Sequence, residues 1–166
     1  MQIQIPKGLF DILPYGTDKK WMLSAYWQYV ESIIRKLCQD YGYQELRTPI
    51  FERTELFQKS VGETSDIVTK EMYTFFDRAK RSMSLRPEGT AALMRAFIEN
   101  NIQASGEKHK FYYLGPMFRY ERPQSGKYRQ IRSLHYCQVT DKLENRPGIR
   151  RLPGIGQSVQ SGIPNG

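Results

Sequence analysis

The sequence contains few of the residues from which metal centres and nucleophilic triads are built. Its 166 residues include two cysteines and two histidines. Cys38 and Cys137 lie far apart and form neither a disulfide framework nor a zinc motif, which fits a reducing compartment. His109 and His135 are too few to favour a histidine metal site or a Ser-His triad.

Long apolar runs and glycine-rich phosphate loops are also missing. No apolar run is long enough to cross a membrane, and the first residues lack the apolar stretch of a secretory signal. We therefore expect a cytoplasmic protein without membrane contact. Neither G-x-x-x-x-G-K-[ST] nor G-x-G-x-x-G occurs, which disfavours P-loop and Rossmann nucleotide sites.

The residues that are present indicate a basic, globular domain. Hydrophobic residues make up 39% and aromatic residues 13% of the chain, enough to build one core. The net charge is +8. This favours a polyanionic partner such as RNA or a nucleotide, although charge of this size also serves solubility alone.

A long amphipathic helix is predicted after an extended segment over residues 6–14. Thr17 is the expected N-terminal cap and Gly42 the stop. Apolar residues recur at helical spacing at Met22, Tyr26, Tyr29, Val30, Ile33 and Leu37. Core packing is the simplest interpretation of this stripe, and a subunit interface is the alternative.

Residues 43–114 are typical of short strands with one further helix. We expect a strand over 43–51 that Pro49 confines to a sheet edge or ends. Irregular chain over 52–67 follows, with a short helical turn near Leu56 and a break at Gly62. Two strands, 71–76 and 82–86, joined by a charged turn, a helix over 90–100 and a buried strand over 111–114 complete this region.

Residues 115–130, GPMFRYERPQSGKYRQ, combine a strand end, a turn signal and several cations. Arg119, Arg122, Lys127 and Arg129 surround a single acidic residue, Glu121. Arginines fixed after a strand can bind nucleotide phosphate bidentately. A β-hairpin with a solvated basic tip is the simpler alternative. Alternation places residues 119 and 121 on one side of the sheet, where they form part of a pocket or a plain ion pair.

The stretch LRPEGT, residues 85–90, is a second candidate site between a strand and a helix. Glu88 can accept an ammonium group there, and Thr90 can add a hydroxyl. The alternative is an ordinary helix N-terminus, with Glu88 at the positive dipole end and Thr90 as cap. Tyr128, after the basic turn, can stack on a purine or serve as a core tyrosine.

Taken in order, these segments resemble the amino-terminal part of a histidyl-tRNA synthetase, a class II aminoacyl-tRNA synthetase. KGLFDILP resembles the first segment of that family. The long helix followed by YQELRTPIFE resembles motif 1, the dimerisation element. EMYTFFDR, LRPEGT and YLGPMFRYERPQSGKYRQ follow in the family's order, the last being most of motif 2. The resemblance covers about residues 3–130.

This resemblance implies an α+β fold, a mainly antiparallel sheet flanked by helices, which is incomplete here. It implies a histidine–tRNA ligase that activates histidine with ATP and transfers it to histidine tRNA, with a homodimer formed through motif 1. Mg²⁺ would accompany ATP, and no protein metal site is expected. By match to the motifs, ATP would bind Arg119, Glu121, Lys127 and Tyr128, with Arg119 as the catalytic residue. Glu88 and Thr90 would hold the α-amino group of histidine.

Lys127 stands where the family usually has arginine, and a larger departure follows at residue 131. Ile131-Arg132-Ser133 replaces the family's Phe-His-Gln, so that Ser133 takes the place of a glutamine expected to help bind histidine. Motif 3, the histidine-specific loop and the anticodon-binding domain have no counterpart. We divide the chain into a partial catalytic domain, 1–130, and a non-matching tail, 131–166.

The tail holds five of the 13 glycines and one aromatic residue, Tyr136. No helical or strand period persists, so we expect it to be irregular and disordered. We hypothesise a truncated or frame-shifted product with little or no activity of its own. Two alternatives remain: a regulatory subunit of the histidine-biosynthetic ATP phosphoribosyltransferase, and an unrelated basic RNA-binding module. The complete basic turn, with Lys127 and Arg129, favours the synthetase.

Overall fold

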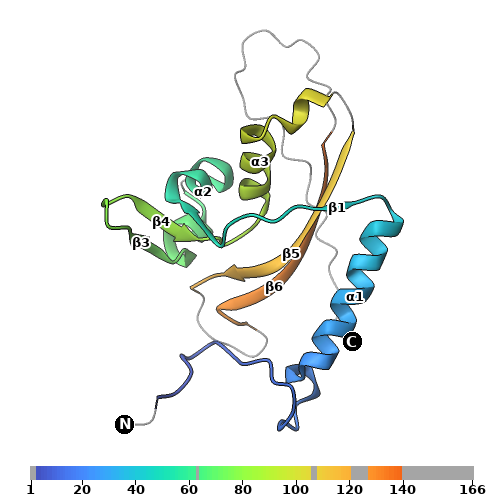
Figure 1. Ribbon diagram of the computed structural model, residues 1–166. Helices are drawn as coiled ribbons and strands as arrows, with labels where there is room; N and C mark the ends of the chain where they lie inside the picture. The colour runs from blue at the N-terminus through green and yellow to red at the C-terminus, as the bar shows by residue number, and fades with distance from the viewer. Residues whose placement is uncertain (1–2, 63, 106–107, 121–126, 140–166) are drawn as a thin grey trace.

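The computed structural model describes residues 3–62, 64–105, 108–120 and 127–139, which form two three-stranded sheets flanked by helices (Figure 1). The helices are α1 (Ser24–Asp40), α2 (Thr54–Val61) and α3 (Thr90–Glu99), with the short helical segments η1 (Lys20–Met22), η2 (Ile67–Glu71) and η3 (Ile102–Ser105). The strands are β1 (Gln44–Glu45), β2 (Phe51–Arg53), β3 (Thr74–Phe76), β4 (Ser82–Leu85), β5 (His109–Phe118) and β6 (Gln130–Val139).

Antiparallel pairing dominates both sheets, as expected for the α+β class. One sheet has the order β1-β5-β6, in which β5 and β6 form a hairpin paired from His109↔Val139 to Phe118↔Gln130, while β1 joins β5 in parallel. The other sheet has the order β2-β4-β3 and is antiparallel throughout. Within the described residues neither sheet closes into a barrel, and this agrees with the prediction of an incomplete sheet.

The core lies between α3 and one face of β5. Because side chains alternate along a strand, Phe111, Tyr113 and Met117 all point to the α3 side, where they pack against Leu93 and Phe97. Each of these side chains is at most 6% exposed. In Figure 1, α1 lies on the opposite side of β5 and β6 from α3. The predicted buried strand over 111–114 and the predicted helix over 90–100 are both confirmed.

The apolar stripe of α1 does not enter the core, and the prediction of core packing is therefore wrong for the single chain. The stripe is about half exposed, with Tyr26 at 48%, Tyr29 at 65%, Val30 at 50%, Ile33 at 50% and Leu37 at 53%.

The inward face of α1 is more polar than this stripe. Glu31 pairs with Arg132 of β6, with 2.6 Å between Oε1 and Nε, and Arg35 pairs with Glu45 of β1, with 2.8 Å between Nη1 and Oε1. Ion pairs thus help to hold this side of α1 against the sheet, and its apolar side is left uncovered by the described residues.

The single strand predicted over 43–51 is instead two short strands in different sheets. β1 pairs with β5, and β2 pairs with β4. Pro49 lies between them and has no backbone N–H to donate to a ladder. β1 already ends at Glu45, four residues before Pro49, so the proline lies in the connection along which the chain crosses to the second sheet.

One helix start and one helix length differ from the sequence predictions, and two helix ends agree with them. α1 begins after Leu23, and the Thr17 hydroxyl instead accepts a hydrogen bond from the Lys19 N–H at 3.1 Å. The helical turn expected near Leu56 is the eight-residue helix α2. Gly62, at φ 100°, follows α2, and Gly42, at φ 74°, follows α1, because both turns need positive φ.

The first residues of the tail that was predicted to be irregular, 131–139, instead form a regular strand. β6 runs to Val139 and pairs with β5 along its whole length. Its sequence shows little strand periodicity, but the ladder offered by β5 satisfies its backbone groups and outweighs weak propensity. Residues 140–166 lie outside the described residues.

Candidate active site

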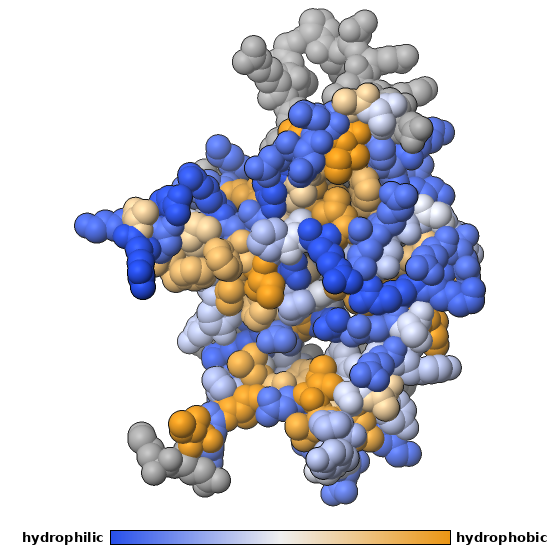
Figure 2. All heavy atoms as spheres, in the orientation of Figure 1, coloured by the Kyte–Doolittle hydropathy of each residue, from blue (hydrophilic) through white to orange (hydrophobic). Residues whose placement is uncertain are grey.

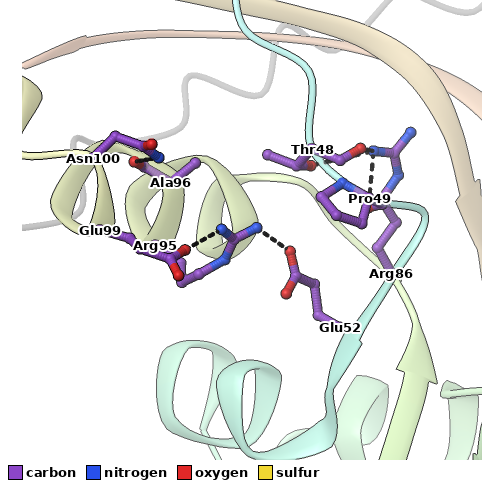
Figure 3. Close-up of polar contacts among 8 residues, drawn as sticks. All are labelled: Thr48, Pro49, Glu52, Arg86, Arg95, Ala96, Glu99 and Asn100. Carbon is purple, nitrogen blue, oxygen red and sulfur yellow. Dashed lines mark hydrogen bonds and ion pairs between the residues drawn. The ribbon is translucent and has the colours of Figure 1, made fainter.

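Arg86, at the end of β4, joins the two sheets from a buried position. Its side chain is 6% exposed. Nε donates to the Pro116 carbonyl at 2.8 Å. Nη1 donates to the Thr48 carbonyl at 3.1 Å, as Figure 3 shows. A Cβ at Gly115 would lie 2.5 Å from Nη2, so β5 needs glycine at this close approach. Burial lowers the pKa of this guanidinium, and carbonyl oxygens supply its partners.

Backbone hydrogen bonds of the same residue complete the junction. The Arg86 N–H donates to the Ile50 carbonyl, and the Phe118 N–H donates to the Arg86 carbonyl, each at 3.0 Å. The chain entering LRPEGT and the chain leaving β5 are therefore held side by side. The two segments that carry the candidate site residues begin at this junction.

Arg95 attaches α3 to the second sheet. Figure 3 shows its guanidinium between Glu52 of β2 and Glu99 of α3. The Glu99 contact measures 2.6 Å between Nη1 and Oε2. This pairing fixes the helix whose N-terminus presents Glu88 and Thr90.

Glu88 caps the N-terminus of α3 through its side chain. Its carboxylate accepts hydrogen bonds from the Thr90 N–H at 2.5 Å and from the Ala91 N–H at 2.9 Å. The N-cap position itself is Gly89, so the expectation that Thr90 caps the helix is wrong. A carboxylate has about four lone-pair sites, so Glu88 keeps acceptor capacity for an ammonium group after making both bonds.

Arg119 reaches the same place from the end of β5. Its Nε donates to the Pro87 carbonyl at 3.1 Å, one residue before Glu88. Its own N–H donates to the Arg129 carbonyl at 2.9 Å, which extends the β5–β6 ladder past Phe118. A fixed cation and a half-buried carboxylate are thus brought together from segments 31 residues apart, counted from residue 88 to residue 119.

Tyr113 and His135 lie beneath this pair of charges. They face each other across β5 and β6, and their rings are stacked, with centroids 4.9 Å apart and planes at 8°. The Tyr113 hydroxyl lies against Gly89 and has no partner of standard hydrogen-bond geometry among the described residues. Burial, and after it the charge of Glu88, raises the pKa of Tyr113, so the phenol stays neutral. Burial also lowers the pKa of His135.

Tyr128 packs against the N-terminal segment KGLFDILP. Its ring meets Phe10 edge-on at 4.9 Å between centroids and lies 6.0 Å from Trp21. Next to it, the Arg129 N–H donates to the Gly8 carbonyl at 2.8 Å. Figure 2 shows exposed apolar residues in the lower part of this view, where Figure 1 places the N-terminal segment and the start of α1. The N-terminal segment therefore packs against Tyr128 and Arg129, the residues that lead into β6.

Of the remaining residues predicted to bind ATP, Lys127 alone is among the described residues. Lys127 is exposed. Glu121, Arg122 and the turn over 123–126 lie outside the described residues. Among the described residues no group of three His, Cys, Asp or Glu side chains is arranged to hold a metal ion. No helix within the same residues is both long and apolar enough to span a bilayer.

Comparison with known proteins identifies the family. The histidyl-tRNA synthetase family model matches residues 22–134. This chain belongs to the histidyl-tRNA synthetase family. The match ends at Leu134 in β6, close to the predicted end of the resemblance at about residue 130.

Individual relatives agree with the family match. The histidine–tRNA ligase of Protochlamydia amoebophila (strain UWE25) is 62% identical over 130 residues, which are 78% of this chain and 31% of the relative. The structure of apo S. aureus histidyl-tRNA synthetase aligns with a TM-score of 0.63 at 41% identity, over 81% of this chain and 28% of that one. The chain therefore spans about a third of the length of such relatives.

A more distant structure shares the fold alone. It is described as an ATP phosphoribosyltransferase regulatory subunit/histidyl-tRNA synthetase from Bacillus halodurans C. It aligns with a TM-score of 0.59 at 19% identity, over 82% of this chain and 32% of that one.

Three residues of the site had no assigned role in the sequence analysis. Arg86 is part of LRPEGT, but its burial between the two sheets depends on the carbonyls of Thr48 and Pro116, which lie far from it in the sequence. Tyr113 was expected only as part of a buried strand. His135 stood in the presumed tail, and only the register of β6 on β5 places it opposite Tyr113.

Proposed function

We propose that this chain forms the part of a histidine–tRNA ligase that binds ATP and histidine. The hydrogen bond from Arg119 to the Pro87 carbonyl carries the proposal, because it holds a cation suited to phosphate one residue along the chain from Glu88, whose carboxylate is suited to an ammonium group. In the reaction, the carboxylate of histidine attacks the α-phosphate of ATP and pyrophosphate leaves. The histidyl group then passes from the adenylate to the terminal ribose of histidine tRNA.

Each site residue has a distinct part in this proposal. Arg119 binds the α-phosphate and stabilises the charge that develops on it in the transition state. Lys127 contacts phosphate as a point charge, Glu121 lies by the nucleotide and Tyr128 lies near the adenine. The α-amino group of histidine binds Glu88, and Thr90 supplies a hydroxyl beside it.

Mg²⁺ fits this site as a companion of the nucleotide. Magnesium usually keeps several waters and binds one or two carboxylates together with substrate phosphates. When bound, the ion would neutralise phosphate charge.

A homodimer formed through α1 is part of the proposal. The α1 stripe of half-exposed apolar side chains is the kind of surface that a partner subunit covers. The helix lies in the segment that resembles motif 1. We place the enzyme in the cytoplasm, where its substrates ATP and tRNA are found.

This chain by itself is proposed to bind ATP without completing the reaction, because motif 3 and the histidine-specific loop have no counterpart in its sequence. Isothermal titration with ATP and Mg²⁺ tests the binding. Arg119→Ala should weaken ATP binding about 10- to 100-fold, the effect expected for charged hydrogen bonds. Arg78→Ala, which removes an exposed arginine in the β3–β4 turn, should leave binding unchanged.

Two results would contradict this proposal. Equal ATP affinity in the Arg119 and Arg78 variants would show that the basic hairpin is not a phosphate site. Histidine-dependent exchange of pyrophosphate into ATP by the purified chain would show that it is active alone.

A further inference from the structure

His135 lies at the amino-acid side of the proposed site. Its imidazole stacks on Tyr113, and the tip of the Tyr113 ring touches Gly89. Gly89 directly follows Glu88, whose carboxylate is the proposed holder of the α-amino group. The Tyr113 ring thus lies between the side chain of His135 and the backbone at Gly89, next to Glu88.

The charges of the site act on this imidazole. Burial is the main cause of its lowered pKa; Glu88 opposes that shift, and Arg119 adds to it. Both charged residues therefore lie close enough to His135 to influence its protonation. With its pKa below the ordinary value, the ring is mostly neutral at pH 7 and can remain buried without a paired charge.

The second histidine of the chain provides a contrast. His109 also stacks on a β5 ring, that of Phe111, with centroids 5.6 Å apart and planes at 5°. It lies four residues before Tyr113, roughly 13 Å along the strand. Its Nε2 lies 2.8 Å from the Ser105 hydroxyl and not near the site charges. Stacking on β5 is therefore common to both histidines, and proximity to Glu88 and Arg119 distinguishes His135.

We propose that the imidazole of His135 occupies the place that the side chain of a free histidine would take, so that this chain excludes histidine from its own site. The inference rests on the proposed function, which puts the α-amino group of histidine on Glu88. A side chain attached to the site competes at an effective concentration on the order of millimolar or higher. A free ligand that binds weakly cannot displace it.

Removing the imidazole provides the test. Isothermal titration with L-histidine is carried out on the full chain, on His135→Ala and on His109→Ala as the matched control. His135→Ala should bind L-histidine at least about tenfold more tightly than the unmodified chain, and His109→Ala should not differ from it. Glu88→Gln added to His135→Ala should abolish the gain, because the amide still caps α3 but carries no charge for the ammonium group.

Equal histidine affinity in the unmodified chain and His135→Ala overturns the inference, and so does a gain that survives Glu88→Gln. ATP titrations of the same proteins separate this failure from failure of the proposed function. If ATP binding depends on Arg119 while His135→Ala gains no histidine affinity, only the inference fails. If ATP does not bind the unmodified chain, the proposed function fails.

A measurement on the unmodified chain keeps the inference testable if His135→Ala does not fold. With ¹³C-labelled histidine side chains, His109→Ala assigns the two ring signals. Addition of unlabelled L-histidine should leave the His135 signal unchanged. A saturable change of that signal would show that free histidine enters beside the ring, and it would overturn the proposal.

Discussion

Gly89→Ala is expected to destabilise the fold through a single contact. Gly89 has φ −117°, a conformation open to any residue, so the backbone contributes no strain. The added Cβ would lie 1.8 Å from Cζ, 2.0 Å from Oη and 2.2 Å from Cε2 of Tyr113. Ordinary carbon contacts are about 3.5–4.0 Å, so the ring has to move by about 1.5 Å or more.

The surroundings of Tyr113 resist that movement. The residue is 5% exposed and its ring is stacked on His135. Overpacking of a filled core costs about 1–3 kcal/mol, and the depth of this overlap places the loss of unfolding free energy near the top, at about 3 kcal/mol. Urea denaturation followed by far-ultraviolet circular dichroism measures it, compared with the unmodified chain at the same pH.

A double-mutant cycle identifies the cause of the loss. Tyr113→Ala removes every clashing atom, and alone it should cost about 3–5 kcal/mol because it leaves a cavity. In that background, Gly89→Ala should cost less than about 0.5 kcal/mol. Tyr113→Phe keeps Cζ and Cε2, so it should not relieve the clash. The reasoning is refuted if Gly89→Ala is as stable as the unmodified chain, or if Tyr113→Ala leaves its cost unchanged.

Three further predictions follow from the same structure. Arg86→Met should lower the unfolding free energy by about 3 kcal/mol, because the half-buried carbonyls of Thr48 and Pro116 lose their donor. Arg47→Met, which breaks an exposed pair with Glu45, should have a much smaller effect, and equal losses for the two variants in urea denaturation would contradict the argument. Ile33→Glu should shift the chain towards monomer in sedimentation equilibrium while Gln28→Glu on the far side of α1 should not, and a monomeric unmodified chain would refute the α1 interface. The unfolding free energy should fall as pH drops below about 6.5, because His135 takes up a proton more readily in the unfolded chain than when it is buried in the fold. His135→Phe should remove this part of the pH dependence. If the unfolding free energy from urea denaturation changes equally between pH 7.5 and 5.5 in the variant and the unmodified chain, another group is responsible.

Local sequence patterns predicted elements well where the partner of each element was close in the chain. The β3–β4 pair was predicted from two apolar runs around a charged turn, and Gly42 and Gly62 marked helix ends because their positive φ is a property of the residue itself. The β5 strand was predicted from its apolar run for the same reason. These features depend on interactions within a few residues.

The same reasoning failed where distant partners decide. The apolar stripe of α1 indicated the helix correctly but not its orientation, because Glu31 and Arg35 pair with residues of β6 and β1. Residues 131–139 looked irregular because their strand form depends on the ladder supplied by β5. Thr90 resembled a cap, but it is the first residue of α3, and Glu88 accepts hydrogen bonds from the N–H groups of Thr90 and Ala91.

By itself, the sequence determined the family, the order of the motifs and the residue types of the site, since these are carried by short runs such as LRPEGT and FRYERPQ. Only the tertiary structure decided that Arg119 lies beside Pro87, that Arg86 is a buried junction and that His135 stacks on Tyr113. The physical reason is that motif residues specify chemistry locally. Burial and register depend on which backbone groups and rings the fold brings together from distant parts of the chain.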